Sequence, residues 1–209
     1  MPRGITENRA LQRMFEQYGP AKGFAGDYIL FAQLGSGGMG SVHAAFDPKM
    51  ERAVALKFLH DHTQDPKALS RFTLEARALA AVSNPHIAAI YDIGRCDERN
   101  APFLVMQLIR GTPLDRALHP VVRIGAPQPR FDLARGMAEL ADALHEAHAA
   151  GIVHRDLKPG NIMLAERRDK VVHLVAIDFG FAKHVGRNYG LTAPGFTVGT
   201  PRYMSPEQT

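Results

Sequence analysis

The chain has 209 residues, of which 45% are hydrophobic and 22% are charged, and this composition is typical of a soluble globular protein rather than of a disordered segment. Its 25 basic and 21 acidic residues leave a net charge of +4, so nucleic-acid binding is not indicated. Apolar runs such as residues 174–177 are too short to cross a bilayer, and the start lacks the apolar core of a signal peptide. We therefore expect a cytoplasmic chain with no membrane segment among these residues.

The cysteine and histidine content argues against disulfides and structural metal sites. The single cysteine, Cys96, excludes an internal disulfide and fits a reducing compartment. Two histidine pairs have ligand-like spacing, His60 with His62 and His145 with His148. No cysteine cluster accompanies either pair, so neither is taken as a metal site.

Residues 1–26 read as an N-terminal extension with a linker. Leu11, Met14 and Phe15 give a short helical pattern, and Gly19 and Pro20 follow it. Strand spacing begins at Tyr28.

A glycine-rich turn occupies residues 34–42 and matches G-x-G-x-x-G. That motif alone is weak evidence for a function, because dinucleotide-binding folds have the same glycine pattern before a helix. Here Val42, Ala44 and Phe46 alternate toward the turn at Asp47, which predicts a strand after the glycines. The turn is therefore read as the tip of a β-hairpin.

Lys57 ends the β-rich run 53–57, and its ordinary interpretation is a lysine at a strand end that reaches solvent. A helix is predicted over residues 67–82, with apolar residues at helical spacing and Glu75 among them. A plain solvated glutamate is the alternative interpretation of Glu75. The apolar positions of this helix are Leu69, Phe72, Leu79 and Val82.

Two further strands are predicted over residues 87–93 and 102–108, which gives an antiparallel sheet of five strands. Residues 119–130 contain three prolines and read as a loop. A long amphipathic helix is predicted over residues 131–150. Its expected inward residues are Leu133, Met137, Leu140 and Leu144.

The most informative segment runs from His154 to Asn161 with the sequence HRDLKPGN, and residues 178–180 follow it as DFG. Together with the glycine-rich turn and the Gly199 to Glu207 segment, these motifs resemble the protein kinase family, closest to the eukaryotic-like serine/threonine kinases of bacteria. The resemblance begins near Tyr28 and continues to the last residues. It implies an α+β, bilobal fold with a five-stranded small lobe, one main small-lobe helix and a mainly helical large lobe.

The resemblance implies a non-specific serine/threonine protein kinase that uses ATP and Mg²⁺, with Mn²⁺ as an alternative metal. Asp156 corresponds to the residue that accepts or orients the hydroxyl proton, and Lys158 to the cation that faces the γ-phosphate. Asn161 and Asp178 correspond to the metal ligands.

The resemblance also implies which residues bind the nucleotide. Lys57, paired with Glu75, would hold the α- and β-phosphates, while Met106 would guard the back of the adenine pocket. The family more often has glutamate at the position of Gln107, whose backbone would meet adenine. The full predicted set is Gly35, Ser36, Gly37, Gly38, Gly40, Val42, Ala55, Lys57, Glu75, Met106, Gln107, Ile109 and Met163. Asp115 matches a position that sometimes contacts ribose, and a helix-start acid is the equal alternative.

Arg155 stands directly before Asp156, as in kinases that are activated by phosphorylation of a loop. The corresponding loop in this chain is residues 181–202. Thr192 is the first candidate for autophosphorylation and Thr197 the second, whereas Thr200 matches the threonine of the acceptor pocket. Expected partners are protein substrates, with self-association for autophosphorylation in trans. Leu79, Ile90, His154 and Phe179 match the apolar stack that links the lobes of active kinases.

The predicted divisions are an extension (1–26), a small lobe (27–108) and a partial large lobe (109–209). The family continues through further helices after the position of Glu207, so a fragment of an active kinase is favoured over a shortened chain or a protein completed by another chain. Activity of this piece, and a membrane anchor beyond it, are left open. The alternatives are a pseudokinase that binds nucleotide without efficient catalysis and a small-molecule phosphotransferase of similar fold.

Overall fold

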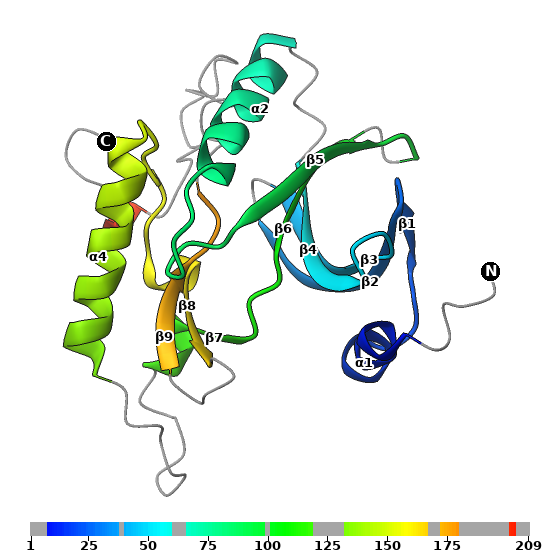
Figure 1. Ribbon diagram of the computed structural model, residues 1–209, viewed down its shortest axis with the longest axis horizontal. Coiled ribbons are helices and arrows are strands. Elements are labelled where there is room, and N and C mark those ends of the chain that lie inside the picture. Colours follow the sequence, from blue (N-terminus) through cyan, green and yellow to red (C-terminus); the bar gives the residue numbers. More distant parts are fainter. Residues whose placement is uncertain are drawn as a thin grey trace, which may run out of the picture. The chain divides into compact units, whose positions relative to one another are not determined.

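The computed structural model describes residues 8–37, 40–59, 66–98, 101–118, 132–166, 172–179 and 201–203 (Figure 1). The chain is divided into two compact units. The first unit consists of Met1–Ala76 and Ile90–Leu108, and the second consists of Arg77–Ala89 and Ile109–Thr209. The elements that belong wholly or mainly to the first unit are α1 (Arg9–Tyr18), β1 (Gly23–Ala25), β2 (Tyr28–Gly37), β3 (Gly40–Asp47), β4 (Arg52–Leu59), α2 (Pro66–Ala80), β5 (Ile90–Cys96) and β6 (Ala101–Gln107).

The first unit contains an antiparallel sheet of six strands in the order β1-β2-β3-β4-β6-β5. Five strands were expected, and β1 is the additional one. Its residues 23–25 were assigned to the linker because three residues that begin with glycine show no period-two pattern. Pairing with β2 fixes them, since Gly23 lies opposite Leu30 and Ala25 opposite Tyr28.

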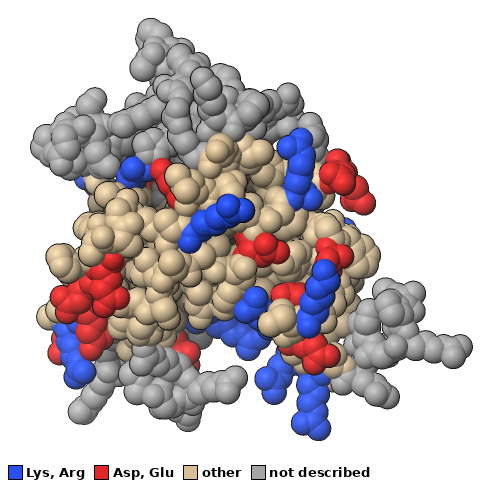
Figure 2. Space-filling view, turned by 45° about the horizontal axis from the view of Figure 1, so that its top comes forward, with Lys and Arg blue, Asp and Glu red and all other residues tan. Residues whose placement is uncertain are grey.

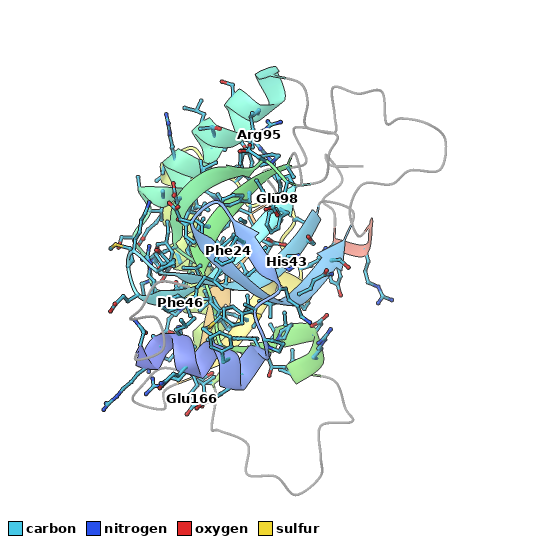
Figure 3. All side chains as sticks on the ribbon, turned by 90° about the vertical axis from the view of Figure 1, so that its right-hand side faces the viewer. Phe24, His43, Phe46, Arg95, Glu98 and Glu166 are labelled. Atoms are coloured by element: carbon cyan, nitrogen blue, oxygen red, sulfur yellow. The ribbon has the colours of Figure 1, made fainter. Side chains whose placement is uncertain are left out.

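The strand register divides the side chains of this sheet between two faces, because directly paired residues lie on the same face. One face, which we call the lysine face, carries the pairs Ala44 with Ala55 and Val42 with Lys57. The opposite face carries a buried apolar cluster that includes Leu30, Ala45, Val54, Leu56, Phe58, Phe103 and Val105. His43 and Phe46, both labelled in Figure 3, lie on opposite faces because His43 pairs with Leu56 and Phe46 with Ala53.

The helix α1 packs against the lysine face of the sheet and is not a detached extension. Leu11 and Met14 are buried in one cluster with Phe31, Ala44 and Phe46, together with Ile29. Burying side chains of this size stabilises a fold by about 1.5–3 kcal/mol each. The N-terminal helix is therefore part of the hydrophobic core of the first unit.

The start of α1 is fixed by a side-chain cap. Asn8 Oδ1 accepts hydrogen bonds from the backbone N–H groups of Ala10, at 2.9 Å, and Leu11, at 3.1 Å. We expect Asn8→Ala to lower the free energy of unfolding by about 1 kcal/mol, because two helix N–H groups lose their acceptor. Denaturant unfolding of Asn8→Ala and Asn8→Asp checks this, since the aspartate keeps an acceptor. Equal losses in the two variants would contradict the cap.

The structure corrects the predicted boundaries after α2. The helix ends at Ala80, and β5 begins at Ile90 rather than at Ile87. Ile87 instead forms an isolated parallel bridge with Ala176, and both residues belong to the second unit. Two backbone hydrogen bonds fix this bridge, from Ala88 N to Ala176 O at 2.9 Å and from Ala176 N to His86 O at 2.8 Å.

The second unit combines helices with a three-stranded antiparallel sheet in the order β7-β8-β9. Its elements are β7 (Gly111–Pro113), α3 (Leu114–Ala117), α4 (Leu133–Ala149), the 3₁₀ turn η2 (Pro159–Asn161), β8 (Ile162–Glu166), β9 (Val172–Ala176) and the 3₁₀ turn η3 (Pro201–Tyr203). This sheet was not expected from the sequence. β8 and β9 form a hairpin directly after η2, and β7 pairs along the other edge of β8.

The helix α4 was predicted well in its limits but only partly in its buried face. Leu140 and Leu144 are buried as expected, whereas Leu133 and Met137 are 36% and 41% exposed. Small residues complete the buried face, namely Gly136, Ala143 and Ala147. They recur at helical spacing and allow close packing, so the inward face is rotated from the one that large apolar residues predict.

No helix in the described residues is both long enough and apolar enough to span a membrane. On the face drawn in Figure 2, basic and acidic side chains are interspersed rather than gathered into one patch of a single sign.

Candidate active site

The glycine-rich segment forms the hairpin between β2 and β3, as predicted. Gly35 lies opposite Val42, Ser36 opposite Ser41 and Gly37 opposite Gly40. Gly40 has a φ of 143°, and a Cβ atom built there would lie 1.8 Å from the carbonyl oxygen of Phe58. Only glycine fits at this position, because β3 approaches β4 too closely for any side chain. Gly38 lies outside the described residues.

Lys57 lies inside β4 and not at its end, so the ordinary interpretation of a lysine that reaches solvent is wrong. It is opposite Val42 of β3 and Leu104 of β6, and it is only 7% exposed. A buried ammonium group is costly unless charges or hydrogen bonds compensate it. Glu75 lies on α2 and is half-buried, which does not fit a fully solvated glutamate. The Lys57–Glu75 ion pair stays a prediction.

The residues predicted to contact adenine are divided between the units. In the first unit, Ala55 lies opposite Met106, and both side chains are on the lysine face. Gln107 is opposite Val54 and therefore belongs to the other face, where its side chain is exposed. In the second unit, Met163 lies on β8, and Met163 and Ile109 pack against one apolar cluster formed by Ala88, Ala165 and Val175.

The loop before η2 gathers Asp156, Lys158 and Asn161 through hydrogen bonds. Lys158 Nζ lies 3.0 Å from Asp156 Oδ2, and the two side chains are 28% and 12% exposed. Asn161 Nδ2 donates both to Asp156 Oδ2, at 3.0 Å, and to the Asp156 carbonyl oxygen, at 2.8 Å. The carboxylate of Asp156 is thus held in place by a cation and an amide.

Asp178 is tied to the same loop through the backbone. Ile177 N donates to Asn161 O at 2.9 Å, and Asp178 itself adopts a φ of 63°. Because Asn161 Nδ2 donates to Asp156, the amide oxygen of Asn161 lies on the other side of the Cβ–Cγ bond from that contact. Amide and carboxylate oxygens are the ligands that Mg²⁺ prefers. The assignment of Asn161 and Asp178 as magnesium ligands stays a prediction.

His154 lies at the start of this loop and is 2% exposed. Its Nε2 lies 3.0 Å from the carbonyl oxygen of Ile177, so Nε2 carries the proton and donates. The imidazole ring lies 4.4 Å from the ring of Phe179 between centroids, at an interplanar angle of 34°. Burial lowers the pKa of His154, opposed by the hydrogen bond to Ile177. These contacts agree with a structural role for the buried ring.

The lowered pKa of His154 gives a pH-dependent stability. Because the folded chain holds this imidazole at a pKa below its ordinary value of 6.5, protonation favours the unfolded chain. Its contribution to stability is complete above that ordinary value and is lost as the pH falls through the folded pKa. Denaturant unfolding between roughly pH 7.5 and 5 should therefore show a shallower loss for His154→Phe than for the unchanged chain. Parallel profiles would contradict the prediction.

The structure also shows contacts of these residues that the sequence does not predict. A Cβ atom at Gly160 would lie 3.2 Å from Asp115 Oδ2, so Asp115 approaches the turn η2. The carbonyl of Ile177, which holds His154, carries no sequence signal because it is a backbone group. Of the other predicted site residues, Thr192, Thr197 and Thr200 lie outside the described residues. Among the described ones, no group of three or more His, Cys, Asp or Glu side chains is arranged to hold a metal ion.

The sequence is similar to known kinases over most of its length. A family model described as a protein kinase domain matches residues 28–209. The serine/threonine-protein kinase Pkn1 of Myxococcus xanthus is 38% identical over 185 residues, which are 88% of this chain and 26% of that protein. The DNA damage-responsive serine/threonine-protein kinase RqkA of Deinococcus radiodurans is 40% identical over 189 residues, which are 90% of this chain and 27% of that protein. The chain thus spans about a quarter of these relatives.

Solved structures give the same fold. The kinase domain of Mycobacterium tuberculosis PknI superposes with a TM-score of 0.61 at 26% identity, covering 78% of this chain and 64% of that one. The structure titled "PpkA-294 apo form" has a TM-score of 0.64 at 24% identity, covering 90% and 70%, and this likeness concerns the fold alone.

Proposed function

The chain belongs to the protein kinase domain family, and from this premise we propose that it transfers the γ-phosphate of ATP to serine and threonine hydroxyls of proteins. The observation that carries the proposal is the hydrogen-bonded set of Asp156, Lys158 and Asn161, with the backbone tie from Asn161 to the residue before Asp178. These are the side chains that positioning and charge neutralisation in phosphoryl transfer require.

Asp156 acts on the acceptor in this proposal. Its carboxylate, held by Lys158 and Asn161, accepts or orients the proton of the attacking hydroxyl group. Lys158 lies next to that carboxylate and neutralises negative charge on the migrating phosphoryl group. No covalent intermediate on the protein is needed, so the fixed positions of these side chains are their main contribution.

Asn161 and Asp178 would hold Mg²⁺ through their side-chain oxygens, with Mn²⁺ as an alternative. The ion supplies neutralisation of the phosphate charge. What the chain itself contributes is the fixed orientation of the Asn161 amide, because both hydrogen bonds of Nδ2 go to Asp156.

Nucleotide binding in this proposal uses the glycine-rich hairpin, Lys57 and the residues predicted to meet adenine. Backbone N–H groups of Gly35, Ser36, Gly37, Gly38 and Gly40 would cover the phosphates. Lys57, oriented by Glu75, would contact the α- and β-phosphates. The adenine would meet Val42, Ala55, Met106 and Met163, and the backbone of Gln107 and Ile109.

Regulation by autophosphorylation belongs to the same proposal. Arg155 has a φ of 60° and immediately precedes Asp156, so a phosphate paired with Arg155 would act next to the catalytic carboxylate. Thr192 and Thr197 are the proposed acceptors, reached in trans by self-association, and Thr200 would line the acceptor pocket. Use of ATP agrees with a cytoplasmic location for this domain.

The test is incubation of the purified chain with labelled ATP and Mg²⁺, beside Asp178→Ala, followed by mapping of labelled residues. We expect label on Thr192 or Thr197 that is absent from the variant. ATP binding without any label, in a chain that also fails to phosphorylate serine and threonine peptides, would favour a nucleotide-binding domain without efficient catalysis. Absence of ATP binding would contradict the proposed function.

A further inference from the structure

We propose that α1 is a positioning element for the nucleotide, acting through Leu11 and Met14 on the pair Ala44 and Ala55. The inference rests on the proposed function, since Ala55 is proposed to contact adenine. The helix lies before residues 28–209, which are the part of the chain that the family model matches. Its role is therefore not given by membership of the family.

The packing of α1 is as tight as that of the strands it covers. Leu11 and Met14 are 1% and 0% exposed, and Ala44 beneath them is 0% exposed. Two aromatic side chains of the same cluster, Phe31 and Phe46, close it on the sheet side. The polar residues of α1 face outward, including Arg13. The helix thus contributes a hydrophobic layer that covers Ala44 of β3 on the lysine face.

The strand register places this layer directly beside the proposed adenine site. Ala44 lies opposite Ala55, and directly opposed side chains of antiparallel strands have Cβ atoms about 4.5–5.5 Å apart. Ala53, which packs against the α1 cluster, precedes Ala55 by two residues, a distance of about 7 Å along a strand. Leu108, next to Gln107, packs against the same cluster. Three neighbours of the predicted adenine contacts therefore depend on α1.

The alanines make the sheet dependent on the helix. Ala44 and Ala53 have no side-chain atoms beyond Cβ, so they cannot fill a space left by a shortened Met14. A cavity between α1 and Ala44 would be relieved by movement of β3 relative to β4. That movement displaces Val42, Ala55 and the backbone around Lys57, which are proposed to hold the nucleotide.

The first experiment measures the dissociation constant of a non-hydrolysable ATP analogue with Mg²⁺ at a temperature where each variant is fully folded. We expect Met14→Ala to raise this dissociation constant by about fivefold or more, since a fivefold change is the lower end of the coupling usually found between two sites. Met14→Leu restores most of the side-chain volume and should restore affinity, and Arg13→Ala on the exposed side of α1 should leave it unchanged. If folded Met14→Ala binds the analogue as tightly as the unchanged chain, the role of α1 is overturned and the proposed function is not affected.

The second experiment needs no substitution and decides the matter even where Met14→Ala does not fold. If α1 docking and nucleotide binding favour each other, the bound analogue must stabilise α1 in return. Amide hydrogen exchange at residues 11–18 should slow by a similar factor when the analogue is added. Binding without any change in that exchange would overturn the role of α1, whereas absence of binding would overturn the proposed function together with it.

Discussion

Replacing Asp156 with asparagine is expected to lower the rate constant of phosphoryl transfer by about 10²–10⁴-fold, the usual contribution of a positioned general base. The amide cannot take the hydroxyl proton, yet it is nearly the same shape as the carboxylate and can still accept the hydrogen bond from Asn161 Nδ2. The fold and the affinity for ATP should therefore persist. Initial rates with a serine/threonine peptide, beside ATP binding measured separately, check this.

Asp142→Asn is the matched control for Asp156→Asn, because it makes the same change of charge at an exposed position of α4. Its rate should equal that of the unchanged chain. A normal rate for Asp156→Asn would remove this carboxylate from the chemistry and leave phosphate neutralisation by Lys158 as the main contribution of the loop.

The second large effect is expected for Gly40→Ala. The added methyl group would lie 1.8 Å from the carbonyl oxygen of Phe58, in a backbone conformation of φ 143° that side chains rarely adopt. Both the clash and the strain act at the contact of β3 with β4, so we expect a loss of about 3 kcal/mol or more in the free energy of unfolding. ATP affinity should fall as well, because Lys57 is next to Phe58 on β4.

Gly35→Ala is the control for this prediction. It lies in the same hairpin, and a Cβ atom there meets nothing within 4 Å. Denaturant unfolding should show a loss below about 1 kcal/mol for Gly35→Ala, the usual cost of an ordinary substitution. Similar losses of stability in the two variants would mean that the close approach of Gly40 to β4 does not determine which residues the hairpin tolerates there.

The sequence motifs predicted the fold class, which is confirmed, and singled out the candidate site residues, whereas several individual elements of the fold were not predicted. The positions of Asp156, Lys158 and Asn161 were foreseen because they lie within six residues of one another and belong to a specific motif. Lys57 stood out as a charged residue in an apolar run, although its burial inside β4 could only be seen in the structure. The roles of all the site residues stay predictions, and Thr192, Thr197 and Thr200 also lie outside the described part of the chain.

The errors in the fold have a common physical cause, because each depends on contacts between distant segments. The short strand β1 has no periodicity of its own and exists through its pairing with β2. Ile87 was assigned to a strand by its apolar neighbours, but its backbone pairs with Ala176 instead. The exposure of Leu133 and Met137 follows from the small residues of α4, which a search for large apolar side chains overlooks.

The bridge between residues 86–88 and β9 also sets an order of assembly on the ribosome. His86 Nδ1 contacts the carbonyl oxygen of Leu174 at 2.8 Å, and these residues are 88 positions apart. At 5–20 residues per second, His86 is made roughly 4–18 s before its partner. All strands of the first unit are complete when Gln107 is added, well before that time. We expect the six-stranded sheet to form while Ile87 and Ala88, buried in the finished protein, are still exposed on the nascent chain.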